Sequence, residues 1–234
     1  MKAILRSGFL ALVMMALAVP AIAGPLEDRL AAEQIRPVDY ASLLRLWRSL
    51  AEQGYAEEQF YLGLTYHTGK GVPQDYAEAV KWWRKAAEQG SAAAQYNLGT
   101  MYEAGEGVMQ DDGEAVTWYR IAADQGFADA QYNLGVMCKT GRGVQQDYGA
   151  AVKWYRIAAE QGLAQAQSNL GVMYTSGLGV PQDIVMAHMW FNLAAAPGHE
   201  YAQEGRDIVA KRMTPGQIAE AQRMAREWME EHQQ

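Results

Sequence analysis

The stretch from Ser91 to Gly126, SAAAQYNLGTMYEAGEGVMQDDGEAVTWYRIAADQG, is followed at once by a close copy of itself, Phe127 to Gly162. More divergent copies come before and after these two. The glycines at the ends of the copies are each 36 positions apart: Gly54, Gly90, Gly126, Gly162 and Gly198. Self-similarity at a fixed period of about 20–50 residues is typical of solenoids, in which each unit packs on its neighbours. The sequence therefore predicts stacked copies of one unit.

Each unit is predicted to hold two helices. In the first helix, Leu98 and Met101 belong to an apolar set with three- and four-residue spacing, which is the period of a helical face. A glycine recurs inside this helix at Gly63, Gly99, Gly135 and Gly171. Glycine costs a helix interior about 1 kcal/mol relative to alanine. Its recurrence therefore predicts that another backbone approaches closely there.

The second helix has recognisable start and stop signals. Asp111 is followed three residues later by Glu114, an arrangement that predicts a capping box at the helix N-terminus. Gly126 is placed where a helix ends in the left-handed conformation. Large aromatic residues lie on this helix in two neighbouring columns: Trp82, Trp118, Trp154 and Trp190, and beside them Trp83, Tyr119, Tyr155 and Phe191. We expect these rings to pack against small residues of the first helices.

The N-terminus is predicted to be a cleaved export signal. Met1 to Ala23 combines a basic start, an apolar run too short for a typical spanning helix, and an Ala-Ile-Ala ending, which are the parts of a secretory signal peptide. Cleavage after Ala23 would leave an exported, periplasmic or secreted protein without stable membrane insertion. A retained membrane anchor is the alternative.

The remaining chain is divided by the period. The predicted parts are a lead-in segment at 24–38, a half unit at 39–54, full units at 55–90, 91–126, 127–162 and 163–198, and a C-terminal cap at 199–234. In the cap, Thr214-Pro215-Gly216-Gln217 predicts the start of a helix. Its apolar stripe includes Ile218, Ala221 and Trp228, so we expect it to cover the open end of the core.

Charge and cysteine content exclude some classes of protein. Loss of Lys2 and Arg6 with the signal changes the formal net charge from −7 to −9, with the basic residues dispersed. Binding of nucleic acid through phosphate neutralisation is therefore not expected. The single cysteine, Cys138, allows no internal disulfide. At a position that holds tyrosine in other units, it is interpreted as a packed residue, with a redox-sensitive thiol as the alternative.

The repeated pattern resembles that of a known family. The elements A-x-x-x-L-G-x-x-Y, G-x-G-V, D-x-x-x-A and a following Trp recur over about residues 39–198 and resemble the Sel-one-like repeat, a relative of the tetratricopeptide repeat. The resemblance implies an all-α, right-handed α/α superhelical solenoid of about four full 36-residue helix pairs, with an N-terminal half repeat and a C-terminal capping helix. It also implies a non-enzymatic scaffold that binds proteins or extended peptides on its concave face.

The candidate binding residues form two columns on the first helices: Asn97, Asn133 and Asn169, with Met101, Met137 and Met173 one turn later. Asparagine offers both a donor and an acceptor to a peptide backbone, and methionine adds adaptable apolar contact. The alternative is that the asparagines bridge helices and the methionines fill the core. Specificity would come from positions that vary between units, such as Glu103 and Arg142.

Catalytic, cofactor and metal sites are not predicted. Lys139-Thr140-Gly141 matches one motif of penicillin-interacting serine enzymes, but the sequence holds no S-x-x-K, and these residues align with ordinary helix ends. The four histidines form no H-x-x-x-H pair. An envelope enzyme, or a binder of β-lactams or other cell-wall compounds, is kept as the alternative function. A monomer is expected, with self-association through an end repeat as the alternative.

Overall fold

The structure, a computed structural model, describes residues 40–196, 198 and 200–232. It divides into two units, residues 1–46 and 47–234, and the described part of the first is the beginning of helix α3. The predicted signal at 1–23 and lead-in segment at 24–38 lie outside the described residues and stay predictions. The second unit contains the repeats and is described from here on.

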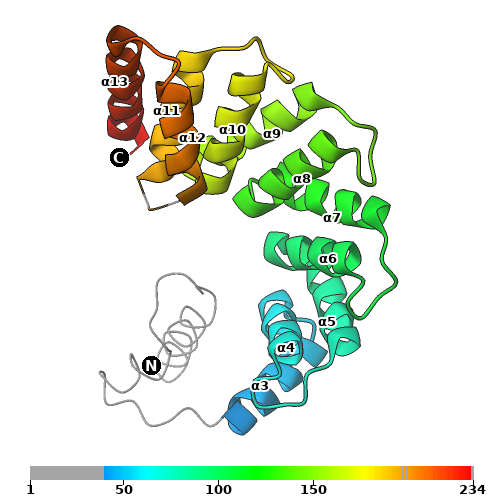
Figure 1. Ribbon diagram of the computed structural model, residues 1–234. Helices are drawn as coiled ribbons and strands as arrows, with labels where there is room; N and C mark the ends of the chain where they lie inside the picture. The colour runs from blue at the N-terminus through cyan, green and yellow to red at the C-terminus, as the bar shows by residue number, and fades with distance from the viewer. Residues whose placement is uncertain (1–39, 197, 199, 233–234) are drawn as a thin grey trace, which may run out of the picture. The chain divides into compact units, whose positions relative to one another are not determined.

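Every regular element among the described residues is a helix. They are α3 (Tyr40–Glu52), α4 (Ala56–Thr68), α5 (Tyr76–Glu88), α6 (Ala92–Ala104), α7 (Asp112–Asp124), α8 (Ala128–Thr140), α9 (Tyr148–Glu160), α10 (Ala164–Ser176), α11 (Ile184–Ala195), α12 (Glu200–Ala210) and α13 (Pro215–His232). The pairs α4–α5, α6–α7, α8–α9 and α10–α11 pack together, and each pair packs on the next (Figure 1). This is the predicted all-α solenoid of helix pairs.

The turn inside each repeat is built as the sequence predicts, with one difference. Gly105 ends α6 in the left-handed conformation, with φ of 72°, and its N–H donates to the Met101 carbonyl. Asp111 then caps α7 by accepting a hydrogen bond from the Glu114 N–H at 3.0 Å. The second bond of the predicted capping box, from the Asp111 N–H to the Glu114 side chain, does not form. The Asp111 N–H donates instead to the Tyr102 carbonyl at 2.9 Å, so this part of the prediction is wrong.

The second helices α5, α7 and α9 each end in a Schellman motif. At the end of α7, the Gly126 N–H donates to the Ala123 carbonyl at 2.9 Å and the Phe127 N–H donates to the Ala122 carbonyl at 3.1 Å. Gly126 has φ of 91°, which a residue with a Cβ adopts only at a cost. The 36-residue spacing of this glycine therefore marks the point where the chain reverses into the next repeat.

The glycine inside each first helix makes room for an aromatic ring. A Cβ added to Gly99 would lie 2.5 Å from the Tyr119 ring of the paired helix, far inside van der Waals contact. The predicted close approach is confirmed, although the neighbour is a side chain and not a backbone. The equivalent pairs are Gly63 with Trp83, Gly135 with Tyr155 and Gly171 with Phe191. Interlocking of this kind fixes the spacing of the two helices in a pair.

A second set of glycines brings neighbouring repeats together. A Cβ on Gly143, in the loop after α8, would lie 2.1 Å from the Asp112 carbonyl oxygen at the start of α7. Gly143 also has φ of 63°, so both space and backbone conformation require glycine here. Gly107 and Gly179 make the same approach to the preceding repeat. The loop of one repeat thus rests directly on the backbone of the repeat before it.

The buried core runs through the stacked pairs. A larger cluster extends from α7 to α13 and a smaller one occupies α5 and α6. Tyr96 of α6 packs against the larger cluster and Trp118 of α7 packs against the smaller, so the two adjoin. At the far end, α11 packs against α10, α12 and α13.

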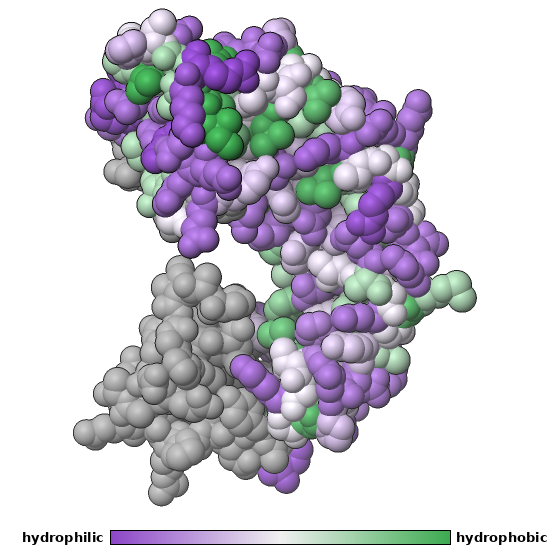
Figure 2. All heavy atoms as spheres, viewed as in Figure 1, coloured by the Kyte–Doolittle hydropathy of each residue, from purple (hydrophilic) through white to green (hydrophobic). Residues whose placement is uncertain are grey.

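The C-terminal cap begins as predicted. The Thr214 hydroxyl accepts a bond from the Gln217 N–H, and the Gln217 side-chain oxygen accepts the Thr214 N–H at 2.9 Å, which is a complete capping box. Ala221 and Ala225 of α13 are buried in the larger cluster. The cap also contains α12, which the sequence did not indicate separately. Figure 2 shows a mostly hydrophilic face, with hydrophobic side chains gathering near the C-terminal helices.

Candidate functional site

The first helices expose one stripe each, and these stripes make the candidate site. Positions four and seven residues apart share a helix face, and in each of these helices such a set of side chains is not fully buried. The stripe, called the first-helix stripe below, consists of Ala93, Asn97 and Thr100 of α6, Asp129, Asn133 and Val136 of α8, and Gln165, Asn169 and Val172 of α10. Asp129 and Gln165 are exposed and the others are half-buried.

The three predicted asparagines differ in their contacts. Asn133 lies near the hydroxyls of Tyr96 and Tyr119 from the preceding repeat, where it opposes the rise that burial causes in the pKa of both tyrosines. Asn169 donates to the Gln165 carbonyl of its own helix at 3.0 Å. The Asn97 side chain has no hydrogen-bond partner among the described residues. Asn97 is therefore the asparagine whose amide is most available to a ligand.

The three predicted methionines lie in the core. Met101, Met137 and Met173 are 1%, 1% and 0% exposed. Side chains covered to this extent cannot touch a partner without rearrangement of the helices. The structure thus places the asparagine column at the surface and the methionine column beneath it. Of the six predicted binding residues, only the three asparagines belong to the first-helix stripe.

Two of the variable positions are engaged in a contact between repeats. The Arg142 guanidinium donates to Asp112 at 2.7 Å and to Glu103 at 2.9 Å, and the Tyr119 hydroxyl donates to Glu103 at 2.7 Å. Asp112 and Glu103 raise the pKa of Arg142, and burial followed by the Glu103 contact raises the pKa of Tyr119. Glu103 and Arg142 thus take part in a contact between neighbouring repeats.

Cys138 interrupts a column of arginine–tyrosine hydrogen bonds. Arg48 donates to Tyr66, Arg84 to Tyr102, and Arg156 to Tyr174 at 2.7 Å, all from one repeat to the next. Cys138 takes the tyrosine position in the third repeat and is 3% exposed. Burial raises the pKa of the Cys138 thiol. A covered, protonated thiol is a poor nucleophile, which agrees with the interpretation of Cys138 as a packed residue.

A buried glutamine column was missed by the sequence analysis. The Gln131 side chain donates to the Ala123 carbonyl at the end of the preceding repeat at 3.1 Å, and accepts a hydrogen bond from Gln161 at 2.7 Å. Gln59 and Gln95 make the same two bonds. The only signal in the sequence was the invariance of glutamine at this position across the repeats.

The described residues contain no group of three or more His, Cys, Asp or Glu side chains that could hold a metal ion. His188 is 2% exposed, and burial lowers its pKa. Its Nδ1 has no hydrogen-bond partner within the described part of the chain. None of the helices described is both long and apolar enough to cross a membrane.

Comparison with known proteins agrees with this architecture. Four Sel1 repeats match the sequence, at residues 59–91, 92–127, 128–163 and 164–199. No curated protein matches it significantly. The structure is similar to that of a protective antigen of uropathogenic Escherichia coli with an SLR fold, at 36% identity and a TM-score of 0.79, over 87% of this chain and 44% of that one.

The chain thus spans less than half the length of that antigen. It is also similar to a Sel1 repeat protein from Oxalobacter formigenes, at 35% identity and a TM-score of 0.65, over 72% of each chain. The repeat matches cover more than half of the sequence, and the helix pairs in the structure follow the same period. The chain belongs to the Sel1 repeat family.

Proposed function

We propose that this protein is a non-enzymatic interaction scaffold of the bacterial cell envelope, and that it holds a protein or an extended peptide segment on the first-helix stripe. Sel1 repeat proteins generally mediate protein–protein interactions. In this protein the surface for that role would be the first-helix stripe. The resemblance to tetratricopeptide repeats implies that the first helices line the concave side, where one extended ligand can touch several repeats.

The observation that carries the proposal is the recurrence of a side-chain amide on this surface. Asn97, Asn133 and Asn169 occupy the same place in three consecutive repeats, each half-exposed. An amide can donate to a peptide carbonyl and accept from a peptide N–H, so a row of amides suits a backbone of any sequence. Thr100, one turn after Asn97, adds a hydroxyl to the same stripe.

A photocrosslinking experiment tests this surface. A benzoylphenylalanine placed at Thr100 is expected to form a specific ultraviolet-dependent adduct with an envelope protein, and the same residue placed at Thr117 is the matched control. Thr117 is exposed on α7, a second helix. The adduct should weaken when Asn97 and Asn169 are both replaced by alanine. Equal adducts from Thr100 and Thr117 would contradict the proposal.

Export is part of the same proposal and needs its own test. The full chain, expressed in a Gram-negative host, should be recovered from the periplasm with Gly24 as its first residue. Recovery of uncleaved protein in the membrane fraction would support the retained anchor instead. Incubation with a labelled β-lactam tests the enzyme alternative, because saturable covalent labelling would overturn the scaffold assignment.

A further inference from the structure

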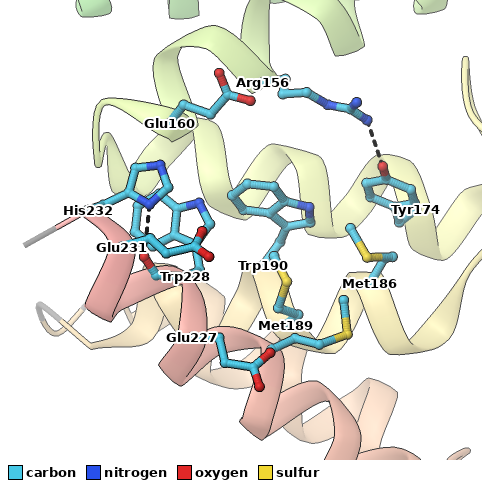
Figure 3. Close-up of a pocket in the computed structure, with 11 residues that line it drawn as sticks. Arg156, Glu160, Tyr174, Met186, Met189, Trp190, Glu227, Trp228, Glu231 and His232 are labelled. Atoms are coloured by element: carbon cyan, nitrogen blue, oxygen red, sulfur yellow. Dashed lines mark hydrogen bonds between the residues drawn. The ribbon is translucent and has the colours of Figure 1, made fainter.

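A second surface, separate from the first-helix stripe, lies where the cap meets the last repeats. A pocket of about 440 Å³ is lined by residues of α9, α10, α11 and α13, and is called the C-terminal pocket below (Figure 3). Met186, Met189 and Trp190 of α11 line it together with Met224 and Trp228 of α13. Methionine and tryptophan side chains give a surface that is apolar and, at the methionines, adaptable.

One buried polar group in this pocket lacks a partner. Trp190 is 5% exposed, and its indole Nε1–H has no hydrogen-bond acceptor among the described residues. Its indole lies in the middle of the lining residues (Figure 3). A buried donor without an acceptor is unfavourable, and a ligand that brings an acceptor relieves that cost. The pocket is therefore incomplete as a hydrogen-bonding site.

The rim of the pocket carries unpaired negative charge. Glu160 of α9 and Glu231 of α13 line the pocket, are exposed, and make no ion pair with any described residue. Glu227 is already bound by Arg223 at 2.7 Å. The one arginine in the lining, Arg156, donates to the Tyr174 hydroxyl (Figure 3). Two carboxylates are thus left facing solvent beside an apolar surface.

We propose that the C-terminal pocket binds a protein segment that presents an arginine or lysine side chain. The cation lies between Glu160 and Glu231, and its aliphatic stem packs on the methionines. The Trp190 indole N–H is covered in the free protein, so a backbone carbonyl of the same segment accepts it once the flexible methionine side chains move aside. An acidic segment would be repelled by the carboxylates. A small quaternary ammonium ion supplies the charge but no acceptor for the indole, so a peptide satisfies more of the site.

The test uses the purified protein and a fluorescein-labelled peptide, Gly-Leu-Arg-Leu-Gly, with binding followed by fluorescence anisotropy. Replacement of arginine by neutral citrulline keeps the shape and should weaken binding about tenfold. The same loss is expected in the double variant Glu160→Gln, Glu231→Gln. Glu88→Gln is the matched control, because Glu88 is exposed at the position of α5 that Glu160 holds in α9, away from the pocket.

A second readout follows the indole directly. The ¹⁵N–¹H signal that disappears in Trp190→Phe should shift on titration with the arginine peptide, and this variant should bind about fivefold more weakly. Trp154→Phe, at the same position of the preceding repeat, is the control and should leave affinity unchanged. Absence of binding at 1 mM peptide, equal affinity for the citrulline peptide, or an unshifted Trp190 signal would each overturn the proposal.

This inference does not depend on the first-helix stripe. The variant Asn97→Ala, Asn169→Ala should bind the arginine peptide as the unaltered protein does. Absence of the crosslink at Thr100 together with intact peptide binding would contradict the proposed role of the first-helix stripe. It would still support the proposed role of the C-terminal pocket.

Discussion

His188 occupies, in the last repeat, the position that valine holds at Val80, Val116 and Val152. Burial and the nearby Arg206 lower its pKa, Asp207 acts in the opposite direction, and Nδ1 has no partner among the described residues. The folded-state pKa is below the unfolded value of 6.5, so the unfolded chain takes up the proton first as pH falls. Stability contributed by neutral His188 is therefore present above about pH 6.5 and is lost below it.

His188→Val is expected to remove this part of the pH dependence. A buried polar atom without a partner costs the native protein about 1–3 kcal/mol, and the variant removes this cost. Thermal unfolding at pH 7.5 and pH 5 measures both effects, and the fall in Tm between the two should be smaller in the variant. An identical fall in both proteins would show that His188 is not responsible.

The contacts of the asparagines predict different costs of truncation. Asn133→Ala removes the polar contact with the hydroxyls of Tyr96 and Tyr119 in the preceding repeat and should lower the free energy of unfolding by about 1 kcal/mol. Asn97→Ala breaks no side-chain bond within the described residues and should stay within about 0.5 kcal/mol of the unaltered protein. Urea unfolding of the two variants measures the difference. Equal losses would mean that Asn97 also has a structural role.

At the scale of the elements, the loop glycines decide how repeats meet. Gly143→Ala would force a Cβ against the Asp112 carbonyl oxygen and a positive φ on alanine, and should destabilise the protein by about 2–4 kcal/mol. Gly149→Ala is the control, because Gly149 lies in α9 at the position of Ala77 in α5. This second change should be neutral or slightly stabilising. Denaturant unfolding of both variants measures the contrast.

The helix pairs and their ends could be predicted because local chemistry determines them. Gly105, Asp111 and Gly126 act within a few residues of their own positions, so the spacing alone locates the helices. The candidate site was only half predictable. Four residues turn a helix by about 40° beyond a full turn. Met101 therefore lies at the edge of the face that carries Asn97, and the side chains of the neighbouring α5 cover it while Asn97 stays half-exposed.

Contacts between segments far apart in the chain could not be predicted from the sequence. Gln131 and Gln161 are recognisable as repeated residues, yet nothing local indicates that they bond to each other. The C-terminal pocket depends on α13 packing against α11, which brings Trp228 near residues of α9 and α10. Only the packed structure shows that the indole of Trp190 lacks an acceptor there.

For the molecule as a whole, the cap should control stability at its end of the array. A chain that stops at Ala196 would expose Phe191 and the α11 surface that α12 and α13 bury. Such a chain is expected to bind a hydrophobic dye and to lose amide protection first in α10 and α11, because each repeat is stabilised only by its neighbours. Hydrogen exchange measures this loss, and uniform protection along the truncated array would contradict it.

The glutamine column has a consequence for how such a protein can change in length. Gln59, Gln95 and Gln131 each make the same pair of bonds, one to the repeat before and one within their own. A duplicated 36-residue segment inserted between two internal repeats would bring with it both the glutamine and the groups that bond to it. Evolution could therefore lengthen or shorten the array by whole repeats without any new kind of contact between them.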